Sequence, residues 1–396
     1  MKASPALVHF ALAMGGFAIG TTEFATMSLL PFFADGLRID EPTAGHVISA
    51  YALGVVVGAP LLAILAAKLA RRTLLLLLMV LFALANGLSA LAPTYEWMLV
   101  FRFLSGLPHG AYFGIAALVA ASLVPQEKRT QAVARVMLGL TTATIVGVPF
   151  ANWLGQALGW RWGFGVVTAV SVLTVAMIWL VAPKQPPEPG ASPLKEFAAL
   201  RSRQVWLTLA TGAIGFGGLF AVYTYLASTL MEVTGVGAAA VPIVLAIFGL
   251  GSTAGNLIVP RFADKALMPT AGGLLLFSAL ALALYPAAAS NIWTISLAVF
   301  AVGVGGSLGT VLQTRLMDVA ADAQSLAAAL NHSAFNFANA LGPWLGGMAI
   351  AAGYGWTSTG WVGCALALGG LAFWGLSLLD DRLREARFAK PAACNA

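Results

Sequence analysis

The chain has 396 residues, of which 60% are hydrophobic and 9% charged, and its mean hydropathy is +0.88. A soluble domain carries about 25% charged residues, so this composition excludes a water-soluble globular protein and indicates a polytopic membrane protein. The length suits about a dozen spans of roughly 20 residues each, joined by short loops. The net charge of +6 would suit a nucleic-acid binder, but the positions of the charges argue against that class.

Twelve apolar runs follow one another along the chain, and each predicts a membrane-spanning helix. They lie at approximately 7–33, 44–66, 73–93, 97–124, 131–157, 163–182, 205–230, 239–262, 268–288, 292–314, 325–351 and 357–379. The first run is too long, and its start too poor in basic residues, for a cleaved signal peptide. The sequence therefore predicts an all-α membrane protein with twelve transmembrane helices.

The basic residues alternate between the two sides of the predicted membrane. Eighteen of the 21 lie in the two ends of the chain, or in or at the edge of every second gap between runs. These eighteen are Lys2, Lys68, Arg71, Arg72, Lys128, Arg129, Arg135, Lys184, Lys195, Arg201, Arg203, Arg261, Lys265, Arg315, Arg382, Arg384, Arg387 and Lys390. Because cytoplasmic loops are enriched in Lys and Arg, the pattern predicts that both termini are cytoplasmic and that the charges report topology rather than nucleic-acid binding.

A charged, Pro-rich segment at 183–203, "PKQPPEPGASPLKEFAALRSR", divides the runs six and six, and its second part is a candidate short interfacial helix. The halves echo each other, with "NWLGQALGW" (152–160) in the fifth run and "PWLGGMAIAAGYGW" (343–356) in the eleventh. We therefore expect an N-terminal six-helix bundle over 1–183, a cytoplasmic linker over 184–204, and a C-terminal bundle with its tail over 205–396. Such duplication is typical of transporters whose two bundles rock around a central site.

An acid, a guanidinium and an imidazole lie inside the first and fourth spans. Glu23 is the single formal charge of the first run, and Arg102 and His109 are seven residues apart in the fourth. At 1.5 Å per residue they lie ~15 Å, ~8 Å and ~18 Å below the outer surface, so they would meet if these two spans are neighbours. Intramembrane ionisable residues are functional by default, although a static pair joining two helices, or an Arg102 that reaches the interface, is the alternative.

We interpret Glu23 as a proton carrier. A low dielectric favours the neutral form of a carboxyl group, whereas water and a nearby cation favour the ionised form. Arg102 would supply that cation permanently and His109 when protonated. A proton affinity that differs between two conformations is what couples a proton gradient to transport.

Other polar and aromatic residues are candidates for a substrate cavity. His332, Asn336 and Asn339 share one face of the eleventh span, where Asn side chains bind either a polar substrate or a neighbouring helix. Further candidates are aromatic and are found in spans 4 and 7: Tyr112, Phe216, Phe220 and Tyr223. Gly106, Gly110 and Gly114 form a stripe along span 4 that favours close packing of another backbone.

The chain resembles the major facilitator superfamily, and within it the twelve-span drug:H+ antiporter and sugar efflux branch, which includes arabinose-efflux-permease-like proteins. "GTTEF" in span 1, "RFLSGLPHGAYFG" in span 4 and "GVPFANWLGQALGWRWGF" (147–164) in span 5 carry the resemblance. It implies that helices 1, 4, 7 and 10 line a central cavity, that Arg102 and Gly106 belong to a proton-coupling motif, and that Gly147 and Pro149 belong to an antiporter motif.

One motif departs from the family pattern. After span 2 the family usually has a Gly, then an Asp four residues later and a basic residue; here Ala63, Ala67 and Lys68 stand at these positions, although Arg71 and Arg72 keep the later basic ones. The second half has Asp264 and Lys265, with Pro260 in the place of the Gly. These residues are candidates for gating. In the family, the Asp after span 2 supports a latch on the cytoplasmic side, and Ala67 in its place puts that latch in doubt in the first half.

The leading interpretation is a proton-coupled exporter of a drug, a sugar or a related metabolite in the inner membrane, acting as a monomer without metal or cofactor. A facilitator or importer of the same fold is the nearest alternative. A membrane-embedded enzyme is disfavoured, because the four His are too scattered for metal-ligand spacing and no pair of acids lies within a span. Asp380 and Asp381 are expected to be solvated at the end of the last span, and Cys364 and Cys394 to be free thiols.

Overall fold

The computed structural model describes residues 4–39, 41–65, 68–184, 197–237, 240–320 and 323–389, and within these ranges it is all-α, without strands. The longer helices are α1 (Pro5–Ser28), α2 (Leu30–Leu37), α3 (Glu41–Leu65), α4 (Arg71–Ala90), α5 (Tyr95–Ser122), α6 (Arg129–Thr142), α7 (Val148–Leu158), α8 (Arg161–Val181), α10 (Arg203–Gly215), α11 (Gly217–Glu232), α12 (Val241–Ala263), α13 (Leu267–Ala288), α14 (Ile292–Gly305), α15 (Leu308–Val319), α16 (Gln324–Ala349) and α17 (Ser358–Ala389). The predicted all-α membrane fold is confirmed.

The described helices group into the twelve predicted spans, three of which are broken near the middle. A π-helical turn (Ala143–Gly147) joins α6 to α7, Phe216 separates α10 from α11, and Gly306 and Ser307 separate α14 from α15. Ten helical segments in the described part of the chain are long and apolar enough to cross a membrane. α3 and α16 complete the set.

Two of the differences from the predicted span limits have a clear physical cause. The first run, expected to continue to residue 33, ends as α1 at Ser28, and Leu29 separates it from α2. Pro31 lies in the first turn of α2, where its missing N–H is tolerated but from which it cannot continue the preceding helix. At the other end, α17 extends ten residues beyond the predicted limit of 379, because its last turns are charged and leave the apolar region.

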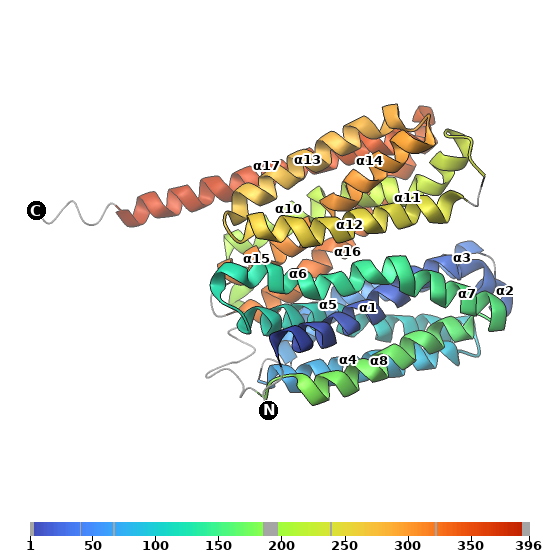
Figure 1. The fold of residues 1–396 in the computed structure, drawn as a ribbon, viewed down its shortest axis with the longest axis horizontal. Helices are drawn as coiled ribbons and strands as arrows, with labels where there is room; N and C mark the ends of the chain where they lie inside the picture. Colours follow the sequence, from blue (N-terminus) through green and yellow to red (C-terminus); the bar gives the residue numbers. More distant parts are fainter. Residues whose placement is uncertain are drawn as a thin grey trace, which may run out of the picture.

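The helices form two groups that lie side by side (Figure 1). In the first, α5 packs on α3 and α4, and α1 packs on α6 and α8; in the second, α17 packs on α10 and α13, and α12 on α14. Contacts between the groups run mainly from α16 to α3 and α5, and from α12 to α6. α1 begins and α17 ends at the same end of the molecule, here named the terminal end; the opposite end is the distal end.

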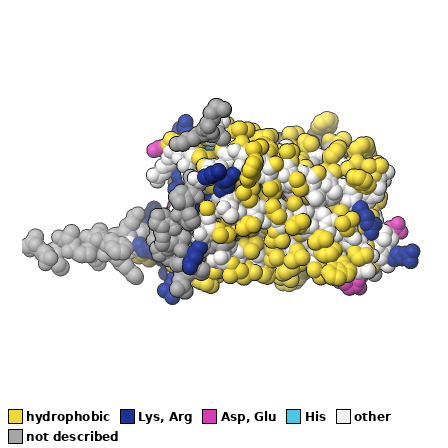
Figure 2. All heavy atoms as spheres, turned by 90° about the horizontal axis from the view of Figure 1, so that it is seen from below, with side chains coloured by type: hydrophobic (Ala, Val, Ile, Leu, Met, Phe, Trp, Pro, Cys, Tyr) yellow, Lys and Arg dark blue, Asp and Glu magenta, His cyan; other side chains and the backbone are white. Residues whose placement is uncertain are grey.

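The outer surface matches a bilayer. Figure 2 shows hydrophobic side chains over the middle of the molecule, with Lys and Arg gathered at its two ends. Exposed large apolar residues such as Leu84, Trp179 and Leu297 occur along this band. This arrangement fits a hydrocarbon layer about 30 Å thick between two polar interfaces.

Several expectations fall partly or wholly outside the described residues. These include the positions of Lys2, Ala67, Lys195, Lys390 and Cys394, and the linker from 185 to 196. In the described part of the linker, Phe197–Arg201 forms one 3-10 turn rather than an α-helix. Cys364 is a free thiol.

Candidate functional site

A cavity of about 120 Å³ lies between the two groups of helices. Its walls come from α1, α5, α6, α11, α12, α15 and α16, together with the π-helical turn after α6, the α10–α11 break and the α14–α15 break. Six aromatic residues line it: Phe24, Phe216, Phe220, Tyr223, Phe248 and Phe335. The rings of Phe24 and Tyr223 approach to 6.3 Å between centroids from opposite groups, so they narrow the cavity below the roughly 300–1,000 Å³ of typical ligand pockets.

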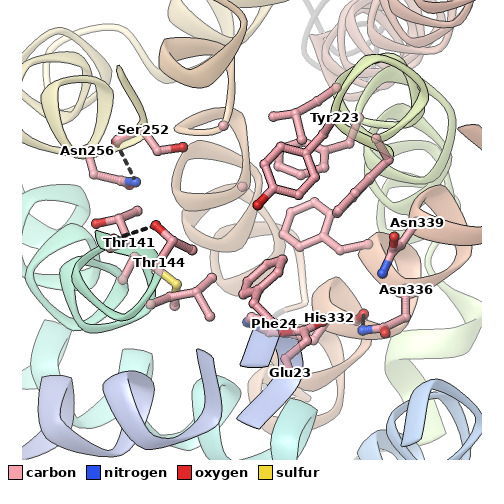
Figure 3. A pocket seen from close by; sticks show the side chains of 18 of the residues that line it. Glu23, Phe24, Thr141, Thr144, Tyr223, Ser252, Asn256, His332, Asn336 and Asn339 are labelled. Carbon is pink, nitrogen blue, oxygen red and sulfur yellow. Dashed lines mark hydrogen bonds between the residues drawn. The ribbon is translucent and has the colours of Figure 1, made fainter. Parts of the chain in front are cut away.

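Among the described residues, Glu23 is the only carboxylate in the lining of this cavity. It is half-buried on α1, next to Phe24, and Figure 3 shows it at the same wall as His332. No ion pair joins Glu23 to Arg102, although both residues are described. The acid therefore faces the cavity rather than a permanent partner.

Arg102 lies behind the cavity wall and is only 1% exposed, so it does not reach the membrane interface. One guanidinium nitrogen donates to Thr22 Oγ1 at 3.0 Å and to Ser105 Oγ at 3.4 Å. Its charge lies 4.5 Å from the ring centroid of Tyr51, an arrangement that stabilises a desolvated cation. Because Thr22 precedes Glu23 on α1, Arg102 is held one residue away from the acid without bonding to it.

Two histidines face each other across the boundary between the groups. His109 of α5 and His332 of α16 have ring centroids 5.2 Å apart, and both line the cavity. His109 Nδ1 is hydrogen-bonded to Tyr51 Oη at 2.9 Å. Tyr51, whose ring lies against Arg102, therefore connects the histidine to the arginine. His332 stacks on Phe113 at 4.5 Å, and its Nε2 has no hydrogen-bond partner.

The other predicted cavity residues of α10, α11 and α16 lie in the lining. Phe216, at the α10–α11 break, and Phe220, Tyr223, Asn336 and Asn339 all contribute to it. Asn336 donates from Nδ2 to the backbone oxygen of His332, whereas its Oδ1 has no partner. That unpaired acceptor is available to a polar group in the cavity.

Tyr112 does not line the cavity, contrary to the prediction. Its side chain is fully buried between α5 and α1, where its hydroxyl donates to the backbone oxygen of Leu12 at 2.8 Å. A Cβ at Gly15 would approach this hydroxyl to 2.0 Å, so the glycine makes room for the ring. Tyr112 is on the same helix as His109, but its side chain points toward α1, where α5 and α1 pack, rather than toward the cavity.

The sequence prediction missed a polar wall opposite Glu23. Ser252 and Asn256 of α12 and Thr310 of α15 line the cavity, with Thr141 and Thr144 on the α6 side (Figure 3). Thr310 donates to Asn256 Oδ1 at 2.6 Å. The available signal was the polar segment "GSTAGN" (251–256) inside an otherwise apolar span.

The three glycines of α5 pack against two different helices. A Cβ at Gly106 would lie 2.1 Å from the backbone oxygen of Tyr51 on α3, inside the first group. At Gly114 it would lie 2.7 Å from the backbone nitrogen of Ala329 on α16, and at Gly110 it would lie 3.2 Å from the Ala329 oxygen. At Gly110 the nearest atom is the Cβ of Ala59 on α3, at 2.6 Å. The stripe therefore joins helices within one group at Gly106, contacts both groups at Gly110, and joins the two groups at Gly114.

The two antiporter-motif residues lie beside α1. A Cβ at Gly147 would lie 2.1 Å from Thr21 Oγ1, so this glycine lets the π-helical turn approach α1 two residues before Glu23. Pro149 lies in the first turn of α7, where the helix resumes.

At the terminal end, polar side chains connect the groups. Asp264 accepts hydrogen bonds from the backbone nitrogens of Thr130 and Gln131 at 2.8 and 3.3 Å, and from Gln131 Nε2 at 2.8 Å. Arg129 pairs with Asp318 at 3.1 Å. Because 129–131 belong to the first group and 264 and 318 to the second, these contacts join the two groups at this end.

The other predicted gating residues have different positions. Lys265 is exposed beside Asp264. Arg71 begins α4, and Arg72 donates to the backbone oxygen of Trp179 at the end of α8. These two residues lie within the first group.

Asp380 and Asp381 are not merely solvated, contrary to the expectation. Asp380 is 7% exposed, accepts from Gln204 Nε2 at 2.9 Å and pairs with Arg203 and Arg384. Asp381 pairs with Arg315. This network joins α10, α15 and α17 within the second group.

Comparison with known proteins identifies the family. The model of the family described as "Major Facilitator Superfamily" matches residues 12–324. The chain belongs to this superfamily. The inner membrane transport protein YdhP of Escherichia coli K12 is 40% identical over 360 residues, which cover 90% of this chain and 92% of that protein.

Two further relatives are named for what they handle. A "Chloramphenicol resistance protein" of Streptomyces lividans is 33% identical, covering 84% of this chain and 86% of that protein. A "Probable sugar efflux transporter" of Helicobacter pylori P12 is 31% identical, covering 92% and 93%. The chain is thus a multi-pass membrane transporter of this superfamily, with one of these relatives named for resistance to a drug and the other for sugar efflux.

A solved structure agrees in fold. The crystal structure of the superfamily transporter FucP in the outward conformation matches with a TM-score of 0.77 at 16% identity, covering 93% of this chain and 98% of that one. At this identity the likeness shows the fold alone. It confirms the predicted superfamily architecture.

Proposed function

We propose that this transporter exports a small molecule in exchange for protons, by alternating access to the cavity between the two helix groups. The observation that carries the proposal is Glu23, the one carboxylate in the lining of a cavity that lies between groups locked together at the terminal end. A half-buried acid in the wall of a cavity between two moving groups has the position that coupling requires, because its surroundings change when the groups move.

The two groups are the moving bodies of this proposal. They correspond to residues 1–183 and 205–396, joined by the linker 184–204, and the terminal end is the cytoplasmic one. The excess of basic residues at that end supports the assignment. The structure then corresponds to a state closed to the cytoplasm by Asp264 and Asp318 and constricted in the middle by Phe24 and Tyr223.

Coupling operates through the surroundings of Glu23. In the closed cavity the neutral acid is tolerated among aromatic rings. A rotation of its side chain toward Arg102, now held by Thr22 on the same helix, brings a permanent cation close and favours proton release. His109 lies at the same wall and is hydrogen-bonded to Tyr51, whose ring lies against the Arg102 guanidinium. A movement of Arg102 or of His109 therefore changes the surroundings of the other.

The lining supports an amphipathic substrate, either a drug or a sugar-like metabolite. Aromatic rings supply apolar contact area, and Asn336, Asn339 and Asn256 supply amide groups for hydroxyl or carbonyl partners. A facilitator or importer of the same fold remains the second candidate. The same cavity would serve it without Glu23 binding and releasing a proton.

The experiment begins with metabolite profiling of medium from overexpressing and deletion cells, which supplies the substrate. Purified protein is then reconstituted into liposomes, and substrate flux is recorded with internal pH under an imposed proton gradient. We expect substrate movement to be accompanied by opposite proton movement. A flux that ignores the gradient and moves no protons identifies a facilitator, and co-directional movement identifies a symporter.

Glu23→Gln isolates the coupling step. The amide mimics the protonated acid, so we expect substrate binding within about threefold of wild type and loss of gradient-driven transport by at least about tenfold, since a group that cannot release a proton couples nothing. Glu96→Gln is the matched control, because Glu96 is an exposed acid at the distal end of α5. Wild-type export by Glu23→Gln, with no proton released on substrate binding to wild type, would show that Glu23 is structural.

A further inference from the structure

A second hollow lies on the outside of the first group, away from the cavity. It is a groove of about 430 Å³ between α1 and α6, near the terminal end. Its apolar floor is formed by Ala6, Phe10, Ala13, Met14, Phe17 and Leu138. Arg135 and His9 stand at its polar end.

The groove and the central cavity occupy opposite faces of the same helix. On α6, Met137, Leu140 and Thr141 line the cavity, whereas Arg135, Leu138, Gly139 and Thr142 line the groove. At 100° per residue these sets point in roughly opposite directions. Since Phe10 is 55% exposed on the outer surface, the groove opens toward lipid rather than toward the transport path.

Arg135 is exposed, and its position is set by a buried histidine. His9, 2% exposed, makes a 3.1 Å hydrogen bond from Nε2 to the backbone oxygen of Ala120. A carbonyl only accepts, so Nε2 carries the proton and Nδ1 keeps a free lone pair. Arg135 donates to that Nδ1 at 3.3 Å. The histidine thus holds the guanidinium at the groove without neutralising its charge.

No acid of the surrounding helices neutralises Arg135. The helices α1, α5, α6, α8 and α12 contain two acids, Glu23 and Glu96. Two further acids lie on elements that pack on α6: Asp318 of α15 pairs with Arg129, and Glu127 precedes α6 and forms no ion pair with Arg135 among the described residues. Glu23 is 14 residues from His9 along α1, or ~21 Å, and Glu96 lies at the far end of α5. Asp264 is engaged by Thr130 and Gln131 and forms no ion pair with Arg135 among the described residues.

The depth of Arg135 matches the lipid headgroup region. The span from residue 129 to 158 is about 45 Å long at 1.5 Å per residue, and the hydrocarbon core is about 30 Å thick. About 7 Å therefore extends beyond the core at each end, and Arg135 lies ~9 Å from the start of the helix. Its long side chain places the charge at the boundary between headgroups and acyl chains.

We propose that this groove binds one anionic phospholipid, with its phosphate on Arg135 and an acyl chain along Phe10, Met14 and Leu138. An exposed cation at headgroup depth attracts an anionic lipid, and the planar guanidinium is suited to bidentate phosphate contact. The lipid bridges α1, which carries Glu23, and α6, which leads into the π-helical turn at Gly147. The site is independent of the direction of transport.

Native mass spectrometry of the detergent-purified full chain tests the site, with dioleoyl phosphatidylglycerol as the anionic probe and dioleoyl phosphatidylcholine as the zwitterionic one. We expect one phosphatidylglycerol to bind wild type at least about tenfold more tightly than phosphatidylcholine. Arg135→Gln should reduce that preference below about threefold. Lys68→Gln is the matched control, because Lys68 is an exposed cation at the same end outside the groove, and it should keep the preference.

Two further measurements separate the contribution of the lipid headgroup to binding from that of the acyl chain. Met14→Trp fills the groove and leaves Arg135 in place, so it should weaken binding of both lipids without changing their ratio. Inorganic phosphate at millimolar concentration should not displace the lipid. The proposal is overturned if Arg135→Gln and Lys68→Gln have equal effects on the lipid preference, or if wild type shows no preference for phosphatidylglycerol. It is also overturned if Met14→Trp binds both lipids as wild type does, or if inorganic phosphate alone displaces the bound lipid fully.

Discussion

Replacement of Asp264 by alanine removes a contact that joins the two helix groups. Three hydrogen bonds to its carboxylate are lost, from the Thr130 and Gln131 backbone nitrogens and the Gln131 side chain. A hydrogen bond to a charged group contributes about 1.5–3 kcal/mol, but solvent screening at this half-buried site and water replacing the lost partners reduce the total to about 2 kcal/mol. At about 1.4 kcal/mol per tenfold, the ratio of closed to open terminal ends should fall about 30-fold.

Distances between spin labels measure this ratio. One pair, at Lys68 and Ala266, spans the two groups at the terminal end, and a second, at Asp35 and Ser290, spans them at the distal end; all four positions are exposed. In Asp264→Ala we expect a longer terminal-end distance to become populated while the distal-end distance shortens, because alternating access couples the two ends.

Asp380→Ala is the matched control for this experiment. Asp380 makes contacts of similar number, but with Gln204, Arg203 and Arg384 inside the second group. Its loss should lower the unfolding temperature without changing either distance. Unchanged distances in folded Asp264→Ala, or equal changes in the control, would refute the assignment of Asp264 as a contact that holds the terminal end closed.

Three further predictions follow from the packing around the cavity. Gly114→Val adds atoms against the Ala329 backbone, where a Cβ alone would approach to 2.7 Å, so overpacking of about 1–3 kcal/mol should open the terminal end in the same distance measurement; an unchanged distribution contradicts this. Tyr112→Phe removes the bond to the Leu12 oxygen and should reduce the free energy of unfolding by about 1 kcal/mol with KM unchanged; a large KM change at full stability would return Tyr112 to the substrate site. Asn336→Ala removes an unpaired cavity acceptor and should raise KM about fivefold or more at constant expression, a loss of about 1 kcal/mol; unchanged kinetics would make it a packing residue.

The sequence determined the features that depend on solvent and periodicity. Twelve apolar runs and alternating basic loops are imposed by the bilayer, which accepts only helices with internally satisfied backbones, so the fold class was readable without tertiary information. The position of Glu23 as the single charge of an apolar run also marked it as a functional candidate from the sequence alone, because an ionised carboxylate within a span is energetically costly and is rarely found there without a function.

Only the tertiary structure decided which side chains meet. A helical wheel gives the direction of a side chain relative to its own helix, but the neighbour on that side depends on how several helices pack. Arg102 therefore has Thr22, Ser105 and Tyr51 as its direct partners and forms no ion pair with Glu23, and Tyr112 packs between α5 and α1.

The role of each glycine in the α5 stripe was decided in the same way. Spacing predicted close approach at Gly106, Gly110 and Gly114, yet the approaching backbone belongs to α3 at the first and to α16, from the other group, at the last. The periodicity of one helix contains no information on which helix fills its groove, because that choice is made by the shapes and polar contacts of both partners together.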